Sequence, residues 1–417
     1  MKYFLILFLI LPAFSIGAAS PKCPNFRAPK CGSGFILKRK GDCRIPYCEK
    51  TLDQSRSCPS YQPTATSCSP ERYRDQNYQK TIFGNLTCTH DVCARHLYQN
   101  PLMDRRCADP AVHYDTIEKR YHLSCTKFPL YHSTNMKDWV QYPTKHRLAK
   151  KNSYPSWADY GKDWAPEIAK IGNDFVAYLT LNDATNNGKN TGIIGVAKGA
   201  TLSSPLIVEG NHVVKNDRFG VIDPSYFKDP KDGKHYLLFK LDTNKYPSEN
   251  KPTRIVIREL RPDGLRFKGG TSSQTLILGG STFYTLIEGQ DMIEKDGYYY
   301  LFYSIGAYTT NYHVRVVRST SPLGPFDTNQ SRAFLHAEAN QTNGSFYAPG
   351  HGKTIKTADG YYYLYHAKKR LPSNDPDYHT RFPMLDAISF VDGWPILNPG
   401  PNQSHPSTGI KFIPKPL

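Results

Sequence analysis

The chain has 417 residues, of which 39% are hydrophobic and 21% charged, so its composition is that of a globular protein and excludes a largely disordered one. Its length exceeds that of most single domains, and we therefore expect one large and one small domain. Lys and Arg exceed Asp and Glu by 17, which fits either a generally basic surface or a polyanionic glycan partner such as acidic pectin.

The N-terminus has the pattern of a secretory signal. Lys2 precedes an apolar run from Tyr3 to Leu11, and small residues follow at 17–20. This run is too short to span a bilayer, and no later stretch of about 18 apolar residues occurs in the sequence. We therefore expect a signal peptide at residues 1–19, no membrane span, and a secreted, extracellular protein. Sequons of the type Asn-x-Ser/Thr, which predict a glycoprotein on this route, begin at Asn85, Asn329, Asn340, Asn343 and Asn402.

Cysteines crowd the segment that follows the signal. Eight of the ten lie between Cys23 and Cys93, and in an exported chain they predict a disulfide framework. A zinc site is the alternative, but no Cys-x-x-Cys accompanies a pair of histidines. We predict a Cys-rich accessory module at residues 20–95, whose first part resembles antistasin-like inhibitor modules. The last two cysteines, Cys107 and Cys125, flank a hairpin, and we expect them to bond to each other.

From about residue 105 onward a two-strand unit occurs five times. Each unit has a strand that begins near a Pro or Gly, a turn, and a second strand rich in aromatic residues, as in 286–303. The units are 56, 58, 65 and 61 residues apart when they are aligned on Pro110, Pro166, Pro224, Gly289 and Gly350. Four-stranded propeller blades repeat every 40–50 residues or so, and longer loops extend that period. The sequence thus predicts an all-β fold, with a five-bladed β-propeller at residues 96–417 after the small disulfide-rich module.

Three carboxylates stand directly before these Pro or Gly positions. They are Asp109, Asp223 and Glu288, in the first, third and fourth units. The first strand of every propeller blade lines the central channel, so we expect the three side chains to meet in one pit. Such a cluster suggests acid–base chemistry on an uncharged polar substrate. The alternative is that each Asp-Pro pair simply begins a turn.

Seven short blocks between about residues 105 and 396 resemble, in order and at similar spacing, the signature blocks of family 43 glycoside hydrolases. The family consists of inverting glycosidases on five-bladed propellers, which act on arabinan, arabinoxylan, xylan or galactan. Two positions depart from its pattern, namely Gln290, where Pro is common, and Lys353, which adds a charge near the axis. The blocks are 108–110, 164–167, 222–227, 287–289, 319–326, 349–351, and 385–386 leading into 392–395.

The resemblance implies a role for each carboxylate. Asp109 resembles the general base that activates water, and Glu288 resembles the general acid that protonates the leaving oxygen. Asp223 resembles the third carboxylate, which tunes and orients the acid. In an inverting enzyme the acid and the base stand about 6.5–9.5 Å apart, so that water and the sugar ring both fit.

The resemblance also implies residues that bind substrate or metal. His351 resembles an axial histidine that contacts substrate and lies beside a bound cation, often calcium, or the water around it. Arg381 resembles a substrate-contacting arginine, and Trp164 is either a sugar platform or a core residue. No cofactor is required for the chemistry, and calcium at the propeller axis is the metal that the family suggests.

The sequence thus predicts a secreted, inverting O-glycosyl hydrolase that acts on arabinose- or xylose-containing plant-type polysaccharides or oligosaccharides, with Glu288 as acid and Asp109 as base. We expect a monomer that binds no nucleic acid. One alternative is a propeller that binds carbohydrate without catalysis. The other is that the Cys-rich module is the active part, as an inhibitor or adhesion unit carried by the propeller.

Overall fold

The computed structural model describes residues 98–143, 146–185, 191–337, 345–358 and 360–397, apart from the side chain of Lys162, and the backbone alone at 35–40, 45–50, 72–82, 86–95, 97 and 411–412. The chain divides into two compact units, Met1–Ala65 with Asp75–Val92, and Thr66–Arg74 with Cys93–Leu417. The predicted signal peptide, the side chains of the first eight cysteines and the sequons at 85, 340, 343 and 402 lie outside the described residues. The remaining sequon residue, Asn329, is exposed.

Two antiparallel hairpins precede the propeller. One consists of β1 (Phe35–Lys40) and β2 (Ile45–Lys50), and the other of β3 (Arg72–Ile82) and β4 (Leu86–Arg95). In the larger unit, β5 (Leu97–Tyr98) pairs with β26 (Lys411–Phe412) near the chain's end. The predicted domain limits of 20–95 and 96–417 stay a prediction.

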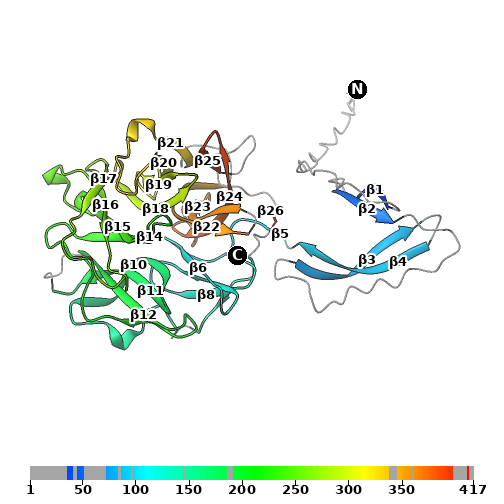
Figure 1. Ribbon diagram of the computed structural model, residues 1–417, viewed down its shortest axis with the longest axis horizontal. Coiled ribbons are helices and arrows are strands. Elements are labelled where there is room, and N and C mark those ends of the chain that lie inside the picture. The colour runs from blue at the N-terminus through cyan, green and yellow to red at the C-terminus, as the bar shows by residue number, and fades with distance from the viewer. Residues whose placement is uncertain are drawn as a thin grey trace, which may run out of the picture. The chain divides into compact units, whose positions relative to one another are not determined.

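In the part of the chain that the structure describes, five four-stranded antiparallel sheets follow one another as the blades of a β-propeller, which confirms the predicted all-β, five-bladed fold (Figure 1). Blade 1 is β6 (Ala111–Asp115), β7 (Arg120–Ser124), β8 (Leu130–Ser133) and β9 (Val140–Gln141). Blade 2 is β10 (Ala158–Ile171), β11 (Asp174–Asp183), β12 (Gly192–Gly199) and β13 (Ile207–Val208). Blade 3 is β14 (Val221–Lys228), β15 (His235–Leu241), β16 (Arg254–Glu259) and β17 (Gln274–Leu278). Blade 4 is β18 (Ile287–Lys295), β19 (Tyr298–Ile305), β20 (His313–Ser319) and β21 (Arg332–His336). Blade 5 is β22 (Phe346–Thr357), β23 (Gly360–Lys369), β24 (Arg381–Val391) and β25 (Trp394–Leu397).

The helices that the structure describes are short 3-10 turns in the loops, and none has the length or hydropathy that crossing a bilayer requires. They are η1 (Lys151–Ser153), η2 (Thr243–Lys245), η3 (Pro247–Glu249) and η4 (Thr328–Gln330).

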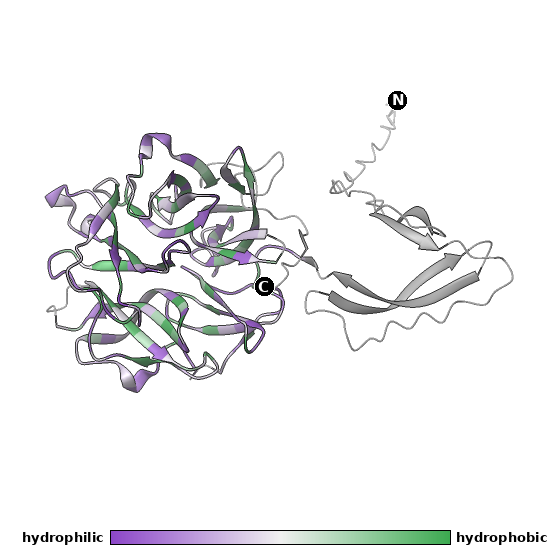
Figure 2. Ribbon diagram, in the orientation of Figure 1, coloured by the Kyte–Doolittle hydropathy of each residue, from purple (hydrophilic) through white to green (hydrophobic). Residues whose placement is uncertain are grey.

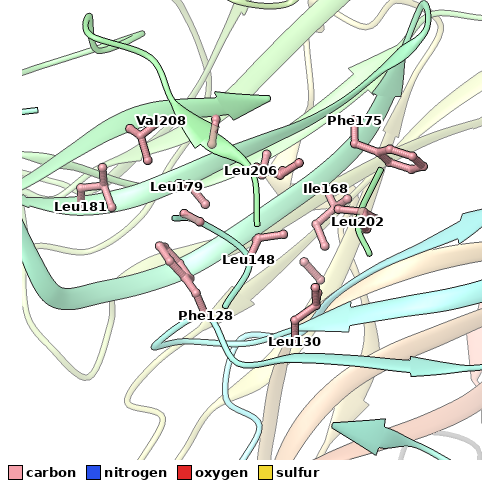
Figure 3. Close-up of a cluster of buried hydrophobic side chains, with 14 of the residues drawn as sticks. Phe128, Leu130, Leu148, Ile168, Phe175, Leu179, Leu181, Leu202, Leu206 and Val208 are labelled. Carbon is pink, nitrogen blue, oxygen red and sulfur yellow. The ribbon is translucent and has the colours of Figure 1, made fainter. Parts of the chain in front are cut away.

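The first strands of the blades form the inner ring. Strands β6, β10, β14, β18 and β22 contact one another in this order, and β22 contacts β6 to close the ring. Hydrophobic residues concentrate in the blade strands (Figure 2). They form separate clusters between neighbouring blades, such as the one in which Phe128 and Leu130 of blade 1 pack near Leu179 and Leu181 of blade 2 (Figure 3).

Strand β19, the second strand of blade 4, shows why such strands have nearly continuous apolar sequences. Tyr299 and Leu301 pack toward blade 3, whereas Tyr300 and Phe302 pack toward blade 5. Successive side chains of a strand point to opposite faces, and a blade is covered on both faces, so both sets must be apolar. The turn before β19 has positive φ at Asp296 and at Gly297, as a two-residue Asp-Gly hairpin requires.

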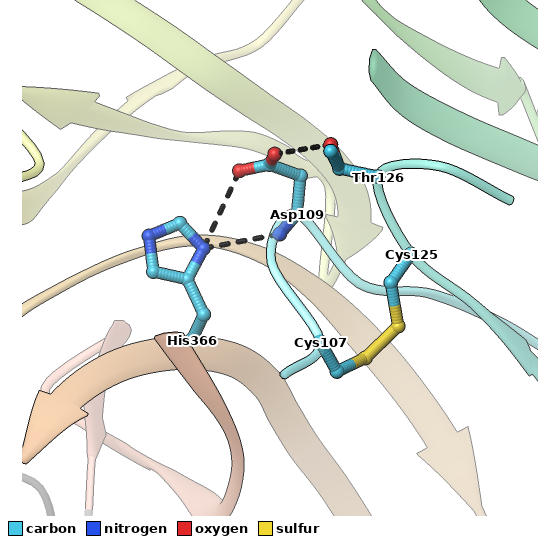
Figure 4. The surroundings of a disulfide bond; sticks show 5 residues. All are labelled: Cys107, Asp109, Cys125, Thr126 and His366. Atoms are coloured by element: carbon cyan, nitrogen blue, oxygen red, sulfur yellow. Dashed lines mark hydrogen bonds and ion pairs between the residues drawn. A yellow bond between two sulfur atoms is a disulfide. The ribbon is translucent and has the colours of Figure 1, made fainter. Parts of the chain in front are cut away.

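A disulfide closes the base of the first hairpin. Cys107 and Cys125 are bonded to each other, as the sequence predicts, and they flank β6 and β7 (Figure 4). Asp109 lies two residues after Cys107, and Thr126 directly follows Cys125. The bond therefore fixes the segment that carries Asp109 against the segment that carries its hydrogen-bond donor.

Candidate active site

The inner strands share a break in their regular pairing near the positions that carry the predicted site residues. In β14 the pairing with β15 skips the residues between Ile222 and Ser225, and in β18 the pairing with β19 skips those between Glu288 and Asp291. A bulge of this kind re-aims side chains and is common near active sites. Asp109, Asp223, Gly289 and His351 all have φ between 50° and 56°, in the left-handed region.

This geometry corrects the predicted alignment of the three carboxylates. Asp223 and Gly289 hold corresponding places, each the first residue of a bulge with positive φ. Glu288 therefore corresponds to Ile222 and lies one residue earlier than the sequence repeat suggests. The sequence repeat does not show this shift, because it aligns Gly289 with Pro224. In the structure Gly289 has the left-handed conformation and therefore corresponds to Asp223.

Gly289 has a second reason to be glycine. A Cβ atom at this position would lie 2.8 Å from the Cα atom of His351, which is too close for any side chain. The amide of Gly289 donates a hydrogen bond to Oδ2 of Asp223 at 3.2 Å. The absent side chain thus lets the inner strands of blades 4 and 5 approach each other beside the carboxylate of blade 3.

Asp109 is buried and surrounded by donors. Arg381 contacts its Oδ1 at 2.8 Å, Nδ1 of His351 lies 3.2 Å from the same oxygen, and Thr126 donates to Oδ2 at 2.6 Å. The backbone amide of Asp109 donates to Nδ1 of His366 at 3.1 Å (Figure 4). Burial alone would raise the pKa of Asp109, but Arg381, the two histidines and Thr126 together hold that pKa well below its ordinary value. Asp109 is therefore ionised over the whole physiological range.

Asp223 has the opposite electrostatic environment. Burial, with the charges of Glu288 and Asp109 adding to it, raises the pKa of Asp223 to about 6, although His351 and Lys240 act against the rise. Nδ1 of His351 lies 3.9 Å from Oδ2 of Asp223, so this ring stands between Asp109 and Asp223. The structure thus brings the predicted residues Asp109, Asp223 and His351 into contact.

Glu288 lies beside a lysine and a tyrosine. Nζ of Lys240 is 2.7 Å from Oε2 of Glu288, and the hydroxyl of Tyr312 donates to Oε1 at 2.9 Å. Lys240 is itself buried and also pairs with Asp242 at 3.0 Å. The ring of Tyr312 stacks on His366 with 5.7 Å between centroids, so Glu288 and Asp109 are joined through two side chains that the sequence analysis did not single out.

Two further predicted residues lie near the pit or on its inner strands. Arg381, at the start of β24, contacts Asp109 as described, and its guanidinium also lies over the ring of Tyr308 at 4.6 Å. Trp164 is half-buried in β10, and the ammonium of Lys245 lies 4.4 Å from its ring centroid. Among the contacts of the described residues, none joins Trp164 to Asp109, Asp223 or Glu288.

Four other inner-strand side chains form a second polar layer. Lys353 of blade 5 contacts Glu167 of blade 2 at 2.6 Å, Ser225 of blade 3 at 2.7 Å and Asp291 of blade 4 at 3.4 Å. Burial raises the pKa of Glu167 to about 7, although Lys353 opposes the rise. The charge that Lys353 adds to the family pattern is therefore a buried cation shared by four blades.

The protein atoms around His351 offer few free oxygen ligands for direct coordination of calcium, so the ion that the resemblance suggests beside His351 would be held mainly through water. Calcium takes six to eight oxygen ligands. Among the described residues, the carboxylate oxygens near His351 are engaged by Arg381, Thr126 and the amide of Gly289, and those of the second layer by Lys353. The reaction proposed for Asp109 and Glu288 therefore includes no step on a metal ion.

Comparison with known proteins agrees with this fold. The family model described as glycosyl hydrolases family 43 matches residues 98–395. A β-D-galactofuranosidase from Aspergillus niger is 27% identical over 289 residues, which cover 65% of this chain and 74% of that protein. A probable arabinan endo-1,5-α-L-arabinosidase from Emericella nidulans is 28% identical over 284 residues, with 59% and 70% covered.

Solved structures share the fold. A thermostable family-43 glycoside hydrolase superimposes with a TM-score of 0.60 at 22% identity, covering 75% of this chain and 98% of that one. An α-L-arabinanase from Cellvibrio cellulosa in complex with arabinohexaose gives a TM-score of 0.57 at 20% identity, with 70% and 95% covered. Because the family model spans well over half of the sequence, the chain belongs to the glycosyl hydrolases of family 43, enzymes whose norm is inversion at the anomeric carbon.

Proposed function

We propose that this family 43 hydrolase is a secreted, inverting enzyme that cleaves arabinose- or xylose-containing polysaccharides or oligosaccharides, with Asp109 as general base and Glu288 as general acid. The observation that supports this most is the contrast between neighbouring carboxylates. Asp109 is held ionised by Arg381, whereas burial raises the pKa of Asp223 to about 6. Carboxyl groups that the protein drives to different protonation states mark a site of acid–base chemistry, and the ionised Asp109 suits a general base. The role of Glu288 as acid rests on its place in the family pattern.

The chemistry follows from these contacts. Asp109 accepts a proton from the water that attacks the anomeric carbon, while Arg381 and Thr126 keep its carboxylate in one orientation. Glu288 donates a proton to the glycosidic oxygen as that bond breaks. Lys240 and Tyr312 then stabilise the carboxylate that remains on Glu288.

Asp223 positions the acid Glu288 and contributes to the charge around it. It accepts the amide hydrogen of Gly289, the residue that directly follows Glu288. The charges of Asp223 and Glu288 interact, and the charge of Glu288 contributes to the raised pKa of Asp223. Binding of a neutral sugar ring removes water from this site, which strengthens each of these interactions.

The substrate class rests on the relatives and on the aromatic residues beside Arg381. The named relatives act on arabinan or on galactofuranosides. Phe283, Tyr284 and Tyr308 are partly exposed, Phe283 contacts each of the two tyrosines edge to face, and Arg381 lies over Tyr308. Exposed aromatic rings next to the base would stack on a further sugar of the chain, so an oligomeric substrate fits better than a single glycoside.

Substitution of the base tests the proposal. Asp109→Asn keeps the size of the side chain and one of its two acceptor oxygens but cannot take a proton, so sugar binding should persist while turnover falls by at least about 100-fold. Calorimetric titration of an arabino- or xylo-oligosaccharide and a reducing-sugar assay measure the two effects. Hydrolysis by the variant at the wild-type rate would exclude Asp109 as the base. Binding without hydrolysis by the wild-type protein would favour the alternative, a propeller that binds carbohydrate without catalysis.

A further inference from the structure

A second cluster of ligand-type side chains lies at the other end of the strand that follows the proposed base. Asp115 ends β6, Glu118 lies in the turn, and His122 is in β7. One ligand atom from each of these residues lies within 4.8 Å of the other two. Asp115 is six residues from Asp109, or about 20 Å along an extended strand, so this cluster is separate from the catalytic pit.

His122 is the unusual member of this cluster. Its side chain is fully buried, yet neither Nδ1 nor Nε2 has a hydrogen-bond partner. Nε2 points at the cluster, since it lies 3.7 Å from Oε2 of Glu118. A buried polar group without a partner is rare and costly in a folded protein, so its presence here calls for a ligand that the ring would bind.

The two carboxylates are already held in place for such a ligand. Oδ1 of Asp115 accepts the backbone amides of Ile117 and Glu118 at 2.8 and 3.2 Å, which fixes the turn. Glu118 accepts hydrogen bonds from Thr201 and Ser203, both at 2.8 Å, in the loop between β12 and β13 of blade 2. These outer contacts orient the ligands before a metal arrives, as supporting hydrogen bonds do in known metal sites.

We propose that Asp115, Glu118 and His122 form a binding site for a divalent transition metal, with zinc as the best fit, in the first hairpin of blade 1. One imidazole nitrogen and two carboxylate oxygens, with water as the fourth ligand, match the zinc donor set. Bonds of about 2.1 Å in a tetrahedron put ligand atoms about 3.4 Å apart, close to the distance between His122 and Glu118. The imidazole disfavours magnesium and calcium, which prefer oxygen.

Arg120 pairs with Glu118 and therefore opposes metal binding. Its Nε lies 3.3 Å from Oε2 of Glu118, and about a third of its side chain is exposed. Because that side chain reaches solvent, it can turn outward when a metal takes its place on Glu118. A consequence is that Arg120→Gln should bind the metal at least as tightly as the wild-type protein.

The test is zinc titration of the full-length, chelator-treated protein by calorimetry at pH 7. The variant is Glu118→Gln, which keeps the size of the side chain and its contacts with Ser203 and Thr201. The matched control is Glu209→Gln, which removes a carboxylate of blade 2 that pairs with Lys198 at 3.8 Å outside the cluster. Circular dichroism and glycoside hydrolysis check that each variant is folded.

We expect the wild-type protein and Glu209→Gln to bind one more equivalent of zinc than Glu118→Gln, or to bind it at least 10-fold more tightly. Saturating zinc should also raise the Tm of the first two by about 3–8 °C and leave that of Glu118→Gln nearly unchanged. Cobalt in place of zinc should give visible absorption bands that Glu118→Gln lacks. Equal stoichiometry and affinity in all three folded proteins would overturn the proposal, since zinc bound by other cysteines or histidines would not respond to Glu118.

Discussion

Removing the charge of Asp223 and removing that of Asp109 should change the stability of the protein in opposite directions. The folded state raises the pKa of Asp223 from 3.8 to about 6, mainly through burial, and it lowers the pKa of Asp109 through Arg381 and two histidines despite burial. A group whose pKa rises on folding binds its proton more tightly in the folded state. Its ionisation therefore destabilises the fold as the pH rises from about 4 to about 6.

The size of the effect follows from the pKa of Asp223. One pKa unit corresponds to about 1.4 kcal/mol, so the difference between 3.8 and about 6 corresponds to at most about 3 kcal/mol at neutral pH. Asp223→Asn removes this cost, and its amide oxygen can still accept the hydrogen bond from Gly289. We expect this variant to be more stable than the wild type at pH 7 by up to about 3 kcal/mol and to lose that advantage at pH 4.

Asp109→Asn should instead lower the stability of the folded protein. It leaves Arg381 buried beside a neutral side chain, and removing one partner of a buried ion pair costs roughly 3–5 kcal/mol. Since the pKa of Asp109 is lowered on folding, the ionised form stabilises the protein above the ordinary pKa and loses this effect only in strong acid.

Urea unfolding of both variants and the wild type at pH 4, 5.5 and 7 measures these differences. The control is Asp296→Asn in an exposed Asp-Gly turn, where either residue suits the conformation, so its stability should stay near that of the wild type at all three pH values. A lower stability of Asp223→Asn than of the wild type at pH 7 would refute the reasoning. So would a gain that is the same at pH 4 and pH 7.

Three other predictions concern the reaction. Glu288→Gln should lower kcat/KM on natural substrates at least about 100-fold and much less on aryl glycosides with good leaving groups; equal losses would contradict its role as acid. NMR of the first product should show the anomer opposite to that of the substrate, and retention would exclude direct attack by water. Tyr308→Ala should raise KM for oligosaccharides several-fold and leave that for aryl monoglycosides nearly unchanged, whereas an equal rise for both would assign Tyr308 to the cleaved sugar instead.

The sequence predicts the blades because their pattern is local. A Pro or Gly precedes or lies within each inner strand, and the next strand is an apolar run that packs against two neighbouring blades. The Cys107–Cys125 bond was predictable for the same reason, since both cysteines flank one hairpin. The one-residue shift of Glu288 was not predictable in this way, because it depends on which residue of the bulge takes the left-handed conformation.

The sequence analysis did not single out Lys240 and His366, which contact the proposed catalytic carboxylates. The alternating pattern of their strands nevertheless indicates that both side chains are buried. In β15, Tyr236 and Leu238 pack toward blade 4, and Lys240 continues this alternate set. In β23, Tyr362 and Leu364 pack with residues of blade 1, and His366 continues that set. A lysine or histidine in such a set must find a polar partner on the facing blade, because a buried charge without a partner is too costly.

The need of a buried lysine or histidine for a polar partner explains the contacts of the carboxylates in the pit. Lys240 reaches Glu288 of blade 4, and His366 reaches Asp109 of blade 1, so each carboxylate is set by a side chain from the second strand of an adjacent blade. The inner strand supplies the residue with left-handed backbone conformation beside each carboxylate, and the neighbouring blade supplies a polar side chain that contacts it.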